Sequence, residues 1–375
     1  MTRATVSAGF LLGWVMTLAA LPLLAEPATG VIDSQTGGMN DASKEETVGF
    51  RNGSVIVAPI PFSNPTVGSG LVLGAGYLFS LDPGSDPSMV GIAGLRSDNG
   101  SRGAGLAANF YFDNNRWKIE SLFAEADIRY DLYTGLGQIP IGQKGRFARA
   151  SLSYGFTPEF SVGLALRYLD TSITPDGPGL PAIPPPFDRF LNVEVASVGL
   201  LTSWDRRDDT IYPTRGFVLD AEALSNHTLT GLTGDYLKGY ANFSAYRPIG
   251  SNGVLAGRLS ACGASDETPF FDQCSLGATD GFRGFSVTQF LDRRSVSAQL
   301  EYRHRFGDRF GAVLFGGAGR VGDSFGNLDA DGTHSAVGLG ARYRVSRKFP
   351  VDFSVDLSRN NEGDDVVYVY VGQRF

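Results

Sequence analysis

Few side chains in this chain of 375 residues have the types and spacing of a catalytic site. The segment Gly322–Gly326, GDSFG, matches the G-x-S-x-G pattern found around a nucleophilic serine. Such a serine lies on a turn from a strand to a helix and needs histidine and acidic partners, whereas this segment connects two strand-like stretches. We therefore expect no catalytic residues here and no enzyme activity.

Metal-ligating residues are also poorly placed. Residues 327–332, NLDADG, resemble the start of a calcium loop, but the twelfth position is Gly338, where a bidentate glutamate is required. The three histidines, His227, His304 and His334, are too scattered to form a zinc site. The sequence predicts no metal and no cofactor.

The two cysteines, Cys262 and Cys274, lie 12 positions apart at the start of a long polar segment. No histidine is near enough in the sequence to complete a metal site with them. In an oxidising compartment a disulfide is favoured over two free thiols. We expect a bridge that tethers the start of the segment 265–291.

The stretch Leu276–Phe306 combines a Gly-rich loop that contains a single arginine, Arg283, with a strand that alternates almost completely. One face of that strand is mainly apolar, with Val296, Ala298, Leu300, Tyr302, His304 and Phe306; the other carries Ser297, Gln299, Glu301, Arg303 and Arg305. A charged face of this breadth suits the inside of a wide, wet barrel better than the core of a soluble sandwich.

Amino-acid composition limits the binding partners of the protein, and the N-terminal sequence indicates its cellular compartment. With 32 basic and 39 acidic residues the net charge is -7, which argues against nucleic acid. Residues 1–25 read as a cleaved signal peptide, with Arg3 before an uncharged run and Ala25 at the cleavage site; a retained membrane anchor is the alternative. Residues 26–53 are polar and aperiodic, so we expect a disordered periplasmic segment too short for a domain of its own.

From residue 54 to 375 the chain reads as a transmembrane antiparallel β-barrel of about 16 strands, because apolar and polar residues alternate in segments long enough to cross a bilayer. The expected strands are 54–62, 67–80, 87–97, 102–113, 116–130, 144–156, 159–173, 191–206, 214–228, 233–248, 252–264, 292–307, 309–321, 334–347, 350–360 and 364–375.

The connections between these strands alternate in length. With both termini in the periplasm, the long ones at 131–143, 174–190, 265–291 and 322–333 all lie outside the cell, whereas the periplasmic turns are short. Outer-membrane barrels have this asymmetry. The cell outer membrane is therefore the predicted location.

The chain stops on an aromatic residue at the end of an amphipathic strand. Its apolar face is expected to comprise Val367, Val369, Val371 and Phe375. We interpret this as the strand that closes the barrel, with Phe375 at the membrane interface.

Two segments resemble motifs of the BamA/TamA-type outer-membrane proteins, the bacterial surface antigen family. DRRDDTIYPTRG is similar to the periplasmic-turn signature, with Asp205, Arg207, Asp208, Pro213, Arg215 and Gly216 at the matching positions. GFRGF is similar to the family's loop motif, carried by Phe282, Arg283, Gly284 and Phe285. The resemblance implies a 16-strand barrel whose extracellular loop folds back into the lumen.

The same resemblance places Arg283 in the lumen, where its family partner is an acid in a Phe-x-Asp-x-Gly pattern. The matching segment here, Phe315–Gly319, lacks that acid. A buried arginine needs an opposite charge, and the inward-facing Glu301 is the candidate counter-ion. We predict that the two side chains lie within about 6 Å of each other.

The function implied by the resemblance is insertion or transport of outer-membrane proteins or lipids through the weak seam between the first and last strands. Expected partners are outer-membrane lipid, nascent outer-membrane proteins and the assembly machinery that reads the C-terminal strand. The chain departs from BamA and TamA because we expect no polypeptide-transport-associated (POTRA) domains before the barrel. The alternative is a passive or gated pore plugged by the 265–291 loop.

Overall fold

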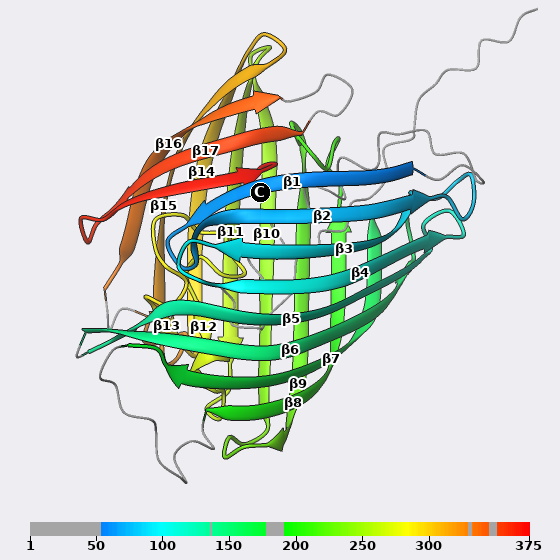
Figure 1. The fold of residues 1–375 in the computed structure, drawn as a ribbon. Helices are drawn as coiled ribbons and strands as arrows, with labels where there is room; N and C mark the ends of the chain where they lie inside the picture. Colours follow the sequence, from blue (N-terminus) through cyan, green and yellow to red (C-terminus); the bar gives the residue numbers. More distant parts are fainter. Residues whose placement is uncertain (1–53, 136, 178–190, 329–331, 345–350) are drawn as a thin grey trace, which may run out of the picture.

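The computed structural model describes residues 54–135, 137–177, 191–328, 332–344 and 351–375 (Figure 1). The predicted signal peptide and the segment 26–53 lie outside these residues. The described residues form a closed antiparallel barrel of 16 strands, as the alternation predicted. No helix among them is long and apolar enough to cross a membrane.

Strands that follow one another in sequence pair along the barrel, with two exceptions: β11 pairs directly with β14, and β1 pairs with β18 to close the barrel. The strands are β1 (Ser54–Asn64), β2 (Gly68–Phe79), β3 (Ser88–Ser97), β4 (Arg102–Phe112), β5 (Trp117–Thr134), β6 (Gly137–Gly155), β7 (Phe160–Pro175), β8 (Asn192–Asp205), β9 (Gly216–Thr230), β10 (Tyr236–Ile249), β11 (Gly253–Ala264), β14 (Arg294–Phe306), β15 (Phe310–Gly322), β16 (His334–Arg344), β17 (Asp352–Asn360) and β18 (Asp365–Val371).

Between β11 and β14 the chain leaves the barrel wall. This segment, residues 265–293, is called the lumen loop below. It contains the 3-10 helix η2 (Phe270–Asp272) and a small two-stranded sheet, β12 (Cys274–Ser275) with β13 (Leu291–Asp292).

The period-2 pattern of each strand places apolar side chains on the outside, where they face lipid. Near the short turns these side chains are aromatic and contact one another from strand to strand. They include Tyr77, Phe79, Phe110, Phe112, Trp117, Tyr154, Phe156, Phe160, Trp204, Phe217, Phe243, Phe310 and Tyr343. Such a girdle marks a membrane interface, here the periplasmic one.

The predicted outer loop at 131–143 is wrong, because β5 and β6 continue as a paired hairpin up to Thr134 and Gly137. In this extension the apolar side chains Tyr130 and Ile141 point into the barrel and are buried. Burial of these side chains against the inner wall holds the strands together beyond the lipid-facing band.

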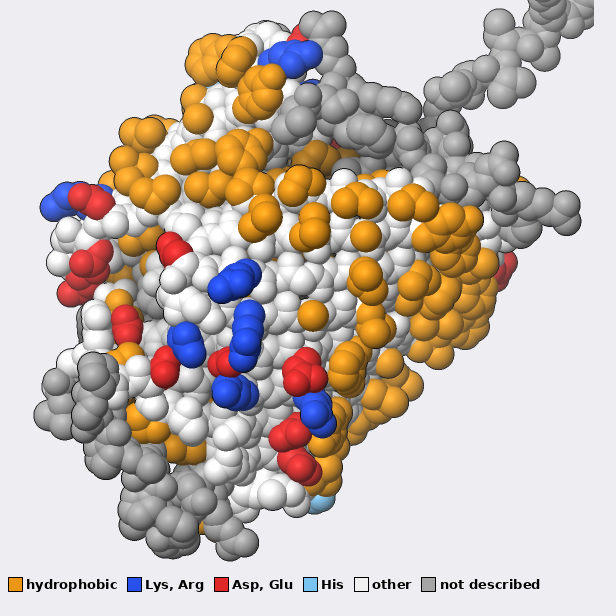
Figure 2. All heavy atoms as spheres, viewed as in Figure 1, with side chains coloured by type: hydrophobic (Ala, Val, Ile, Leu, Met, Phe, Trp, Pro, Cys, Tyr) orange, Lys and Arg blue, Asp and Glu red, His pale blue; other side chains and the backbone are white. Residues whose placement is uncertain are grey.

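Outside this extended wall the surface is charged. Cross-strand ion pairs join Arg102 and Lys144 to Asp127, and Arg146 to Glu125. Figure 2 shows these charges at the end of the strands opposite to the apolar band. Charged side chains are costly in lipid, so this end lies above the membrane.

The barrel closes weakly. Strand β1 pairs with β18 at the single described position Ser63–Val369, whereas β17 pairs with β18 continuously from Phe353–Val371 to Arg359–Asp365. The seam between the first and last strands therefore has far fewer backbone hydrogen bonds than the other junctions of the described barrel.

The predicted position of Phe375 is wrong. Strand β18 ends at Val371, and Gly372 takes a φ of 94°, which turns the chain off the strand. Val367 faces lipid as expected, but Phe375 is buried inside the barrel against Tyr246 and Val254. The positive φ breaks the alternation, so the parity of the strand does not extend to the last residue.

Candidate functional site

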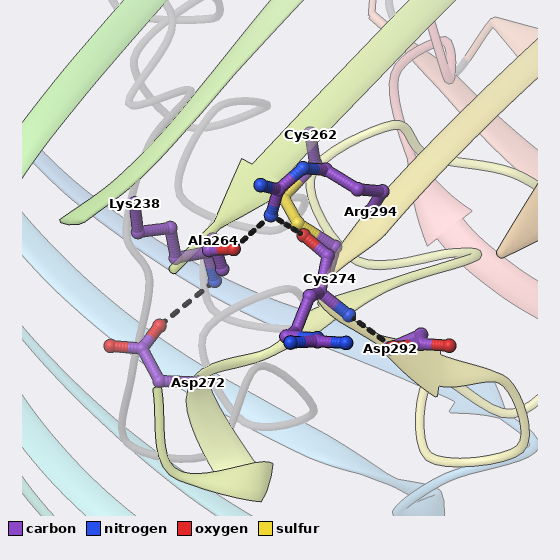
Figure 3. The surroundings of a disulfide bond; sticks show 8 residues. Lys238, Cys262, Ala264, Asp272, Cys274, Asp292 and Arg294 are labelled. Carbon is purple, nitrogen blue, oxygen red and sulfur yellow. Dashed lines mark hydrogen bonds and ion pairs between the residues drawn. A yellow bond between two sulfur atoms is a disulfide. The ribbon is translucent and has the colours of Figure 1, made fainter. Parts of the chain in front are cut away.

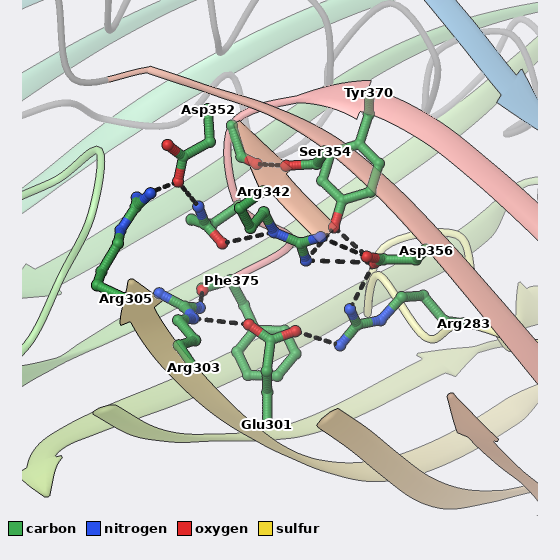
Figure 4. Close-up of polar contacts among 12 residues, drawn as sticks. Arg283, Glu301, Arg303, Arg305, Arg342, Asp352, Ser354, Asp356, Tyr370 and Phe375 are labelled. Atoms are coloured by element: carbon green, nitrogen blue, oxygen red, sulfur yellow. Dashed lines mark hydrogen bonds and ion pairs between the residues drawn. The ribbon is translucent and has the colours of Figure 1, made fainter. Parts of the chain in front are cut away.

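The lumen loop is joined to the ionic side of the barrel by Arg283 (Figure 4). Its guanidinium lies 2.6 Å from Glu301 on β14 and 2.8 Å from Asp356 on β17. The same group lies over the ring of Phe315 on β15, 3.5 Å from its centroid. At most 1% of each of the three charged residues is exposed. Arg283 thus links three strands through one buried side chain.

The ion pairs continue away from Arg283 in two directions. Asp356 also accepts hydrogen bonds from Arg342 at 2.5 Å and from the hydroxyl of Tyr370 at 2.7 Å. Glu301 accepts a hydrogen bond from Arg303 at 2.6 Å. Every acid in this chain of contacts therefore has two cationic neighbours, which offsets the cost of removing its charge from water.

The predicted contact between Arg283 and Glu301 is present. The second acid, Asp356, was not singled out from the sequence. A signal for it exists, because Asp352, Ser354, Asp356 and Ser358 alternate with apolar residues and so share the inward face. What alternation does not reveal is that Asp356 and Arg283 meet across 73 positions of sequence.

The two glycines and two aromatic residues around Arg283 set its position. Gly284 has a φ of 120°, and a Cβ atom there would lie 2.4 Å from the Cβ of Ala336. Its amide donates to the hydroxyl of Tyr368 at 2.8 Å. The rings of Phe282 and Phe285 stack and are 2% exposed. Only glycine at position 284 permits this close approach of the loop to the wall.

A second buried anchor fixes the other end of the lumen loop. Asp272, at the end of η2, is fully buried and lies 2.8 Å from Lys238 on β10 and 3.1 Å from Arg167 on β7. The hydroxyl of Tyr236 donates to the same carboxylate at 2.5 Å. Sequence reasoning missed Asp272 because a lone aspartate in an aperiodic loop looks like any solvated residue.

The disulfide between Cys262 and Cys274 lies beside this anchor (Figure 3). It connects the end of β11 to the start of β12 and spans 12 positions of sequence. Arg294 of β14 donates to the carbonyl oxygen of Ala264 across the same corner. The bridge therefore closes the base of the lumen loop, as expected for a tether.

Removing the disulfide should lower stability without unfolding the barrel. For a closed loop of this length the double variant Cys262→Ser/Cys274→Ser is expected to lose about 2–3 kcal/mol in the free energy of unfolding. Urea titration of the refolded barrel in detergent measures the loss. Dithiothreitol should reduce the stability of the native chain by a similar amount and leave the variant unaffected; equal sensitivity of both would contradict this role.

The lumen loop also reaches the first hairpin of the barrel. The hydroxyl of Ser286 lies 3.1 Å from that of Thr66, whose oxygen accepts the amide of Val287. Thr288 donates to the carbonyl of Asp131 on β5 at 2.6 Å. The loop thus reaches from β11 to the β1–β2 turn and to β5.

The turn at residues 206–215 has the contacts expected of a structural motif. Arg207 makes hydrogen bonds to both carboxylate oxygens of Asp205, at 3.0 and 2.6 Å. Asp208 accepts hydrogen bonds from the hydroxyl of Thr214 and from the amides of Thr214 and Arg215. Gly216 has a φ of 99° and starts β9. Pro213 lies between these contacts, in the middle of the turn.

Acid should weaken this turn. Partial burial raises the pKa of Asp208, but the hydrogen bonds from Thr214 and Arg215 outweigh that effect and hold the pKa below its ordinary value. A lowered pKa stabilises the fold at neutral pH, and the stabilisation is lost as the pH falls below about 4. The difference in unfolding free energy between the native chain and Asp208→Asn should therefore shrink between about pH 6 and pH 3. A difference that grows on acidification would contradict this.

Several solved structures share this architecture. BamA from Haemophilus ducreyi lacking POTRA domains 1-3 matches with a TM-score of 0.60 and 14% identity, covering 85% of this chain and 70% of that one. CdiB from Escherichia coli matches with a TM-score of 0.57 and 12% identity, covering 90% and 69%. CdiB from Acinetobacter baumannii matches with a TM-score of 0.56 and 10% identity, covering 84% and 59%. At these identities the likeness shows the fold alone.

A comparison with curated proteins found no match. Residues 108–375 match the Omp85 superfamily domain. The matched range includes the turn motif, the lumen loop and the charged residues that pair with the lumen loop. Because this match spans well over half of the sequence, the protein belongs to the Omp85 superfamily, as an outer-membrane β-barrel of that family.

Proposed function

We propose that this barrel assists the insertion or transport of outer-membrane proteins or lipids, and that the seam between β1 and β18 opens for this purpose. The observation that carries the proposal is the single paired position, Ser63–Val369, at that seam. Opening it breaks few backbone hydrogen bonds, whereas opening any fully paired junction exposes many unsatisfied groups to lipid. The partners proposed are outer-membrane lipid, nascent outer-membrane proteins and the machinery that recognises β18.

Two experiments test this role. Depletion of the protein should lower the levels of other outer-membrane proteins in quantitative proteomics; unchanged levels would argue against assembly. In a background without the native cysteines, Ser63→Cys with Val369→Cys should lock the seam and abolish rescue of the depleted strain. The matched control, Val355→Cys with Val369→Cys, bonds two strands that are already fully paired and should rescue normally.

A gated pore is the second candidate, and the path of the lumen loop favours it. The loop crosses the interior and is held on one side by Arg283 and on the other by Asp272. Arg283→Ala should release one end and raise the single-channel conductance in planar bilayers. If conductance rises while depletion leaves other outer-membrane proteins unchanged, the pore is favoured over the assembly role.

Delivery to the outer membrane is proposed to depend on residues 1–25 as a cleaved signal peptide. N-terminal sequencing of the protein from purified membranes should begin at Glu26.

A further inference from the structure

The inner wall of the barrel has two unlike halves. On β14, β16 and β17 the inward side chains include paired arginines and acids, as expected for a wet lumen. On β2 to β5 the wall is recessed into an open hollow. Among the described residues, every one that lines the hollow is apolar or glycine, including Val72, Met89, Ala93, Leu95, Ala107 and Leu122.

The recess follows from the register of β3 and β4. Gly91 pairs with Ala107, and Ala93 pairs with Gly105, so each inward pair has one member without a side chain. The outward positions between them carry large side chains, such as Ile92, which is 65% exposed. Side-chain volume is therefore missing at these inward pairs.

An apolar recess is an unfavourable place for water. Water in a cavity needs two to four polar partners, and the side chains of this wall offer none. A polypeptide backbone is also disfavoured, because each of its amide and carbonyl groups would lose its hydrogen bonds there. A hydrocarbon chain has no polar groups to satisfy, so an apolar lining suits it better than it suits water or a polypeptide backbone.

The position of the recess identifies the source of such a chain. It lies on strands whose other face carries lipid-facing residues such as Leu73 and Val90. It is continuous with an apolar cluster that includes Ile60 and Phe62 of β1, the strand at the weakly paired seam. The apolar inner wall thus extends from the recess to the strand at the seam, where membrane lipid is nearest.

We propose that the inward face of β2 to β5 is a binding site for one hydrocarbon chain of a membrane lipid. The site does not depend on the assembly role or the pore role, because it follows from the wall alone. A lipid chain held there fills the apolar half of the lumen opposite the ionic anchor of Arg283.

The test is photolabelling of the full chain in phosphatidylethanolamine vesicles that contain a phospholipid with a diazirine on its acyl chain. Mass spectrometry then distinguishes the two faces of the same strands. Label on inward Met89, Leu95 and Leu122 is expected in addition to label on outward Leu73 and Val90. Label confined to the outward residues would show only surrounding lipid and would overturn the proposal.

Filling the recess provides the matched comparison. Ala93→Phe adds a ring on the inside and should reduce inward labelling at least ~tenfold, as expected for a loss of about one decade in affinity. Ala108→Phe adds the same ring on the outside of β4, at the position paired with Val90, and should leave inward labelling unchanged. If inward labelling survives Ala93→Phe, the proposal is wrong.

Folding of both variants is checked by the difference in gel mobility between unheated and boiled samples. Should Ala93→Phe fail to fold, Ala107→Leu fills the recess from the neighbouring strand with a smaller side chain, and the same loss of inward label is expected. Excess unlabelled phospholipid should compete with the probe in the native chain. Competition by an apolar strand-forming peptide alone would instead assign the recess to polypeptide and overturn the lipid assignment.

Discussion

Replacing Arg283 by methionine is expected to lower the free energy of unfolding by about 3–5 kcal/mol, because it leaves two buried carboxylates facing each other without a cation between them. Glu301 and Asp356 are both fully buried, so water cannot replace the guanidinium. Methionine keeps the length and the apolar packing of the side chain, so the loss reports mainly on charge. Urea titration in detergent, followed by gel mobility, measures it.

The control for this prediction is an ion pair of the same chemistry on the surface. Arg359 lies 3.1 Å from Asp365, and both side chains are at least 60% exposed. Arg359→Met should cost only about 0–1 kcal/mol, because water screens exposed pairs. Equal losses for the two arginines would show that Arg283 does not behave as a buried anchor.

Neutralising the acids separates charge from packing. The triple variant Arg283→Met with Glu301→Gln and Asp356→Asn should be more stable than Arg283→Met alone, since the unpaired carboxylates have gone. Arg283→Lys should fall between the native chain and Arg283→Met. Lysine keeps the charge but has no planar fork to reach both acids and no flat face to lie over Phe315.

The barrel could be predicted from the alternation of apolar and polar residues, because this two-residue repeat is visible within each strand without knowledge of its neighbours. It correctly placed Glu301 on the inward face. The strand β5 nevertheless continues beyond the predicted end at residue 130, to Thr134. Its outward residues Asp127 and Arg129 are charged, which marks a part of the wall outside the membrane.

Alternation shows which residues share a face but not what occupies the space opposite that face. Two acids contact Arg283, and alternation does not identify them. The position of the lumen loop determines which inward-facing acids Arg283 meets. That position depends on contacts distant in sequence, such as Thr66 with Ser286. The apolar recess was equally hidden, because a small residue on the inside looks the same in sequence as a small residue facing water.

The second large effect is expected at the other anchor of the lumen loop. Asp272→Asn keeps the shape of the side chain but removes the negative charge that Arg167 and Lys238 share. Both cations are only 3% exposed, so in the variant two buried charges lack their counter-ion. The free energy of unfolding should therefore fall by about 3–5 kcal/mol. Hydrogen exchange should also increase within residues 268–275, where the loop is no longer held to β7 and β10.

The lumen loop supplies its own control in Asp266. This residue pairs with Arg293, but its side chain is 81% exposed, so Asp266→Asn should change stability by about 0–1 kcal/mol and leave hydrogen exchange near Asp272 unchanged.

Combining Asp272→Asn with Arg283→Met tests whether the loop acts as one unit. If both anchors hold the same rigid segment, releasing the first removes part of what the second stabilises, and the double loss falls below the sum of the two single losses. Strict additivity would mean that the anchors stabilise the barrel wall independently, and that freeing one end does not free the loop.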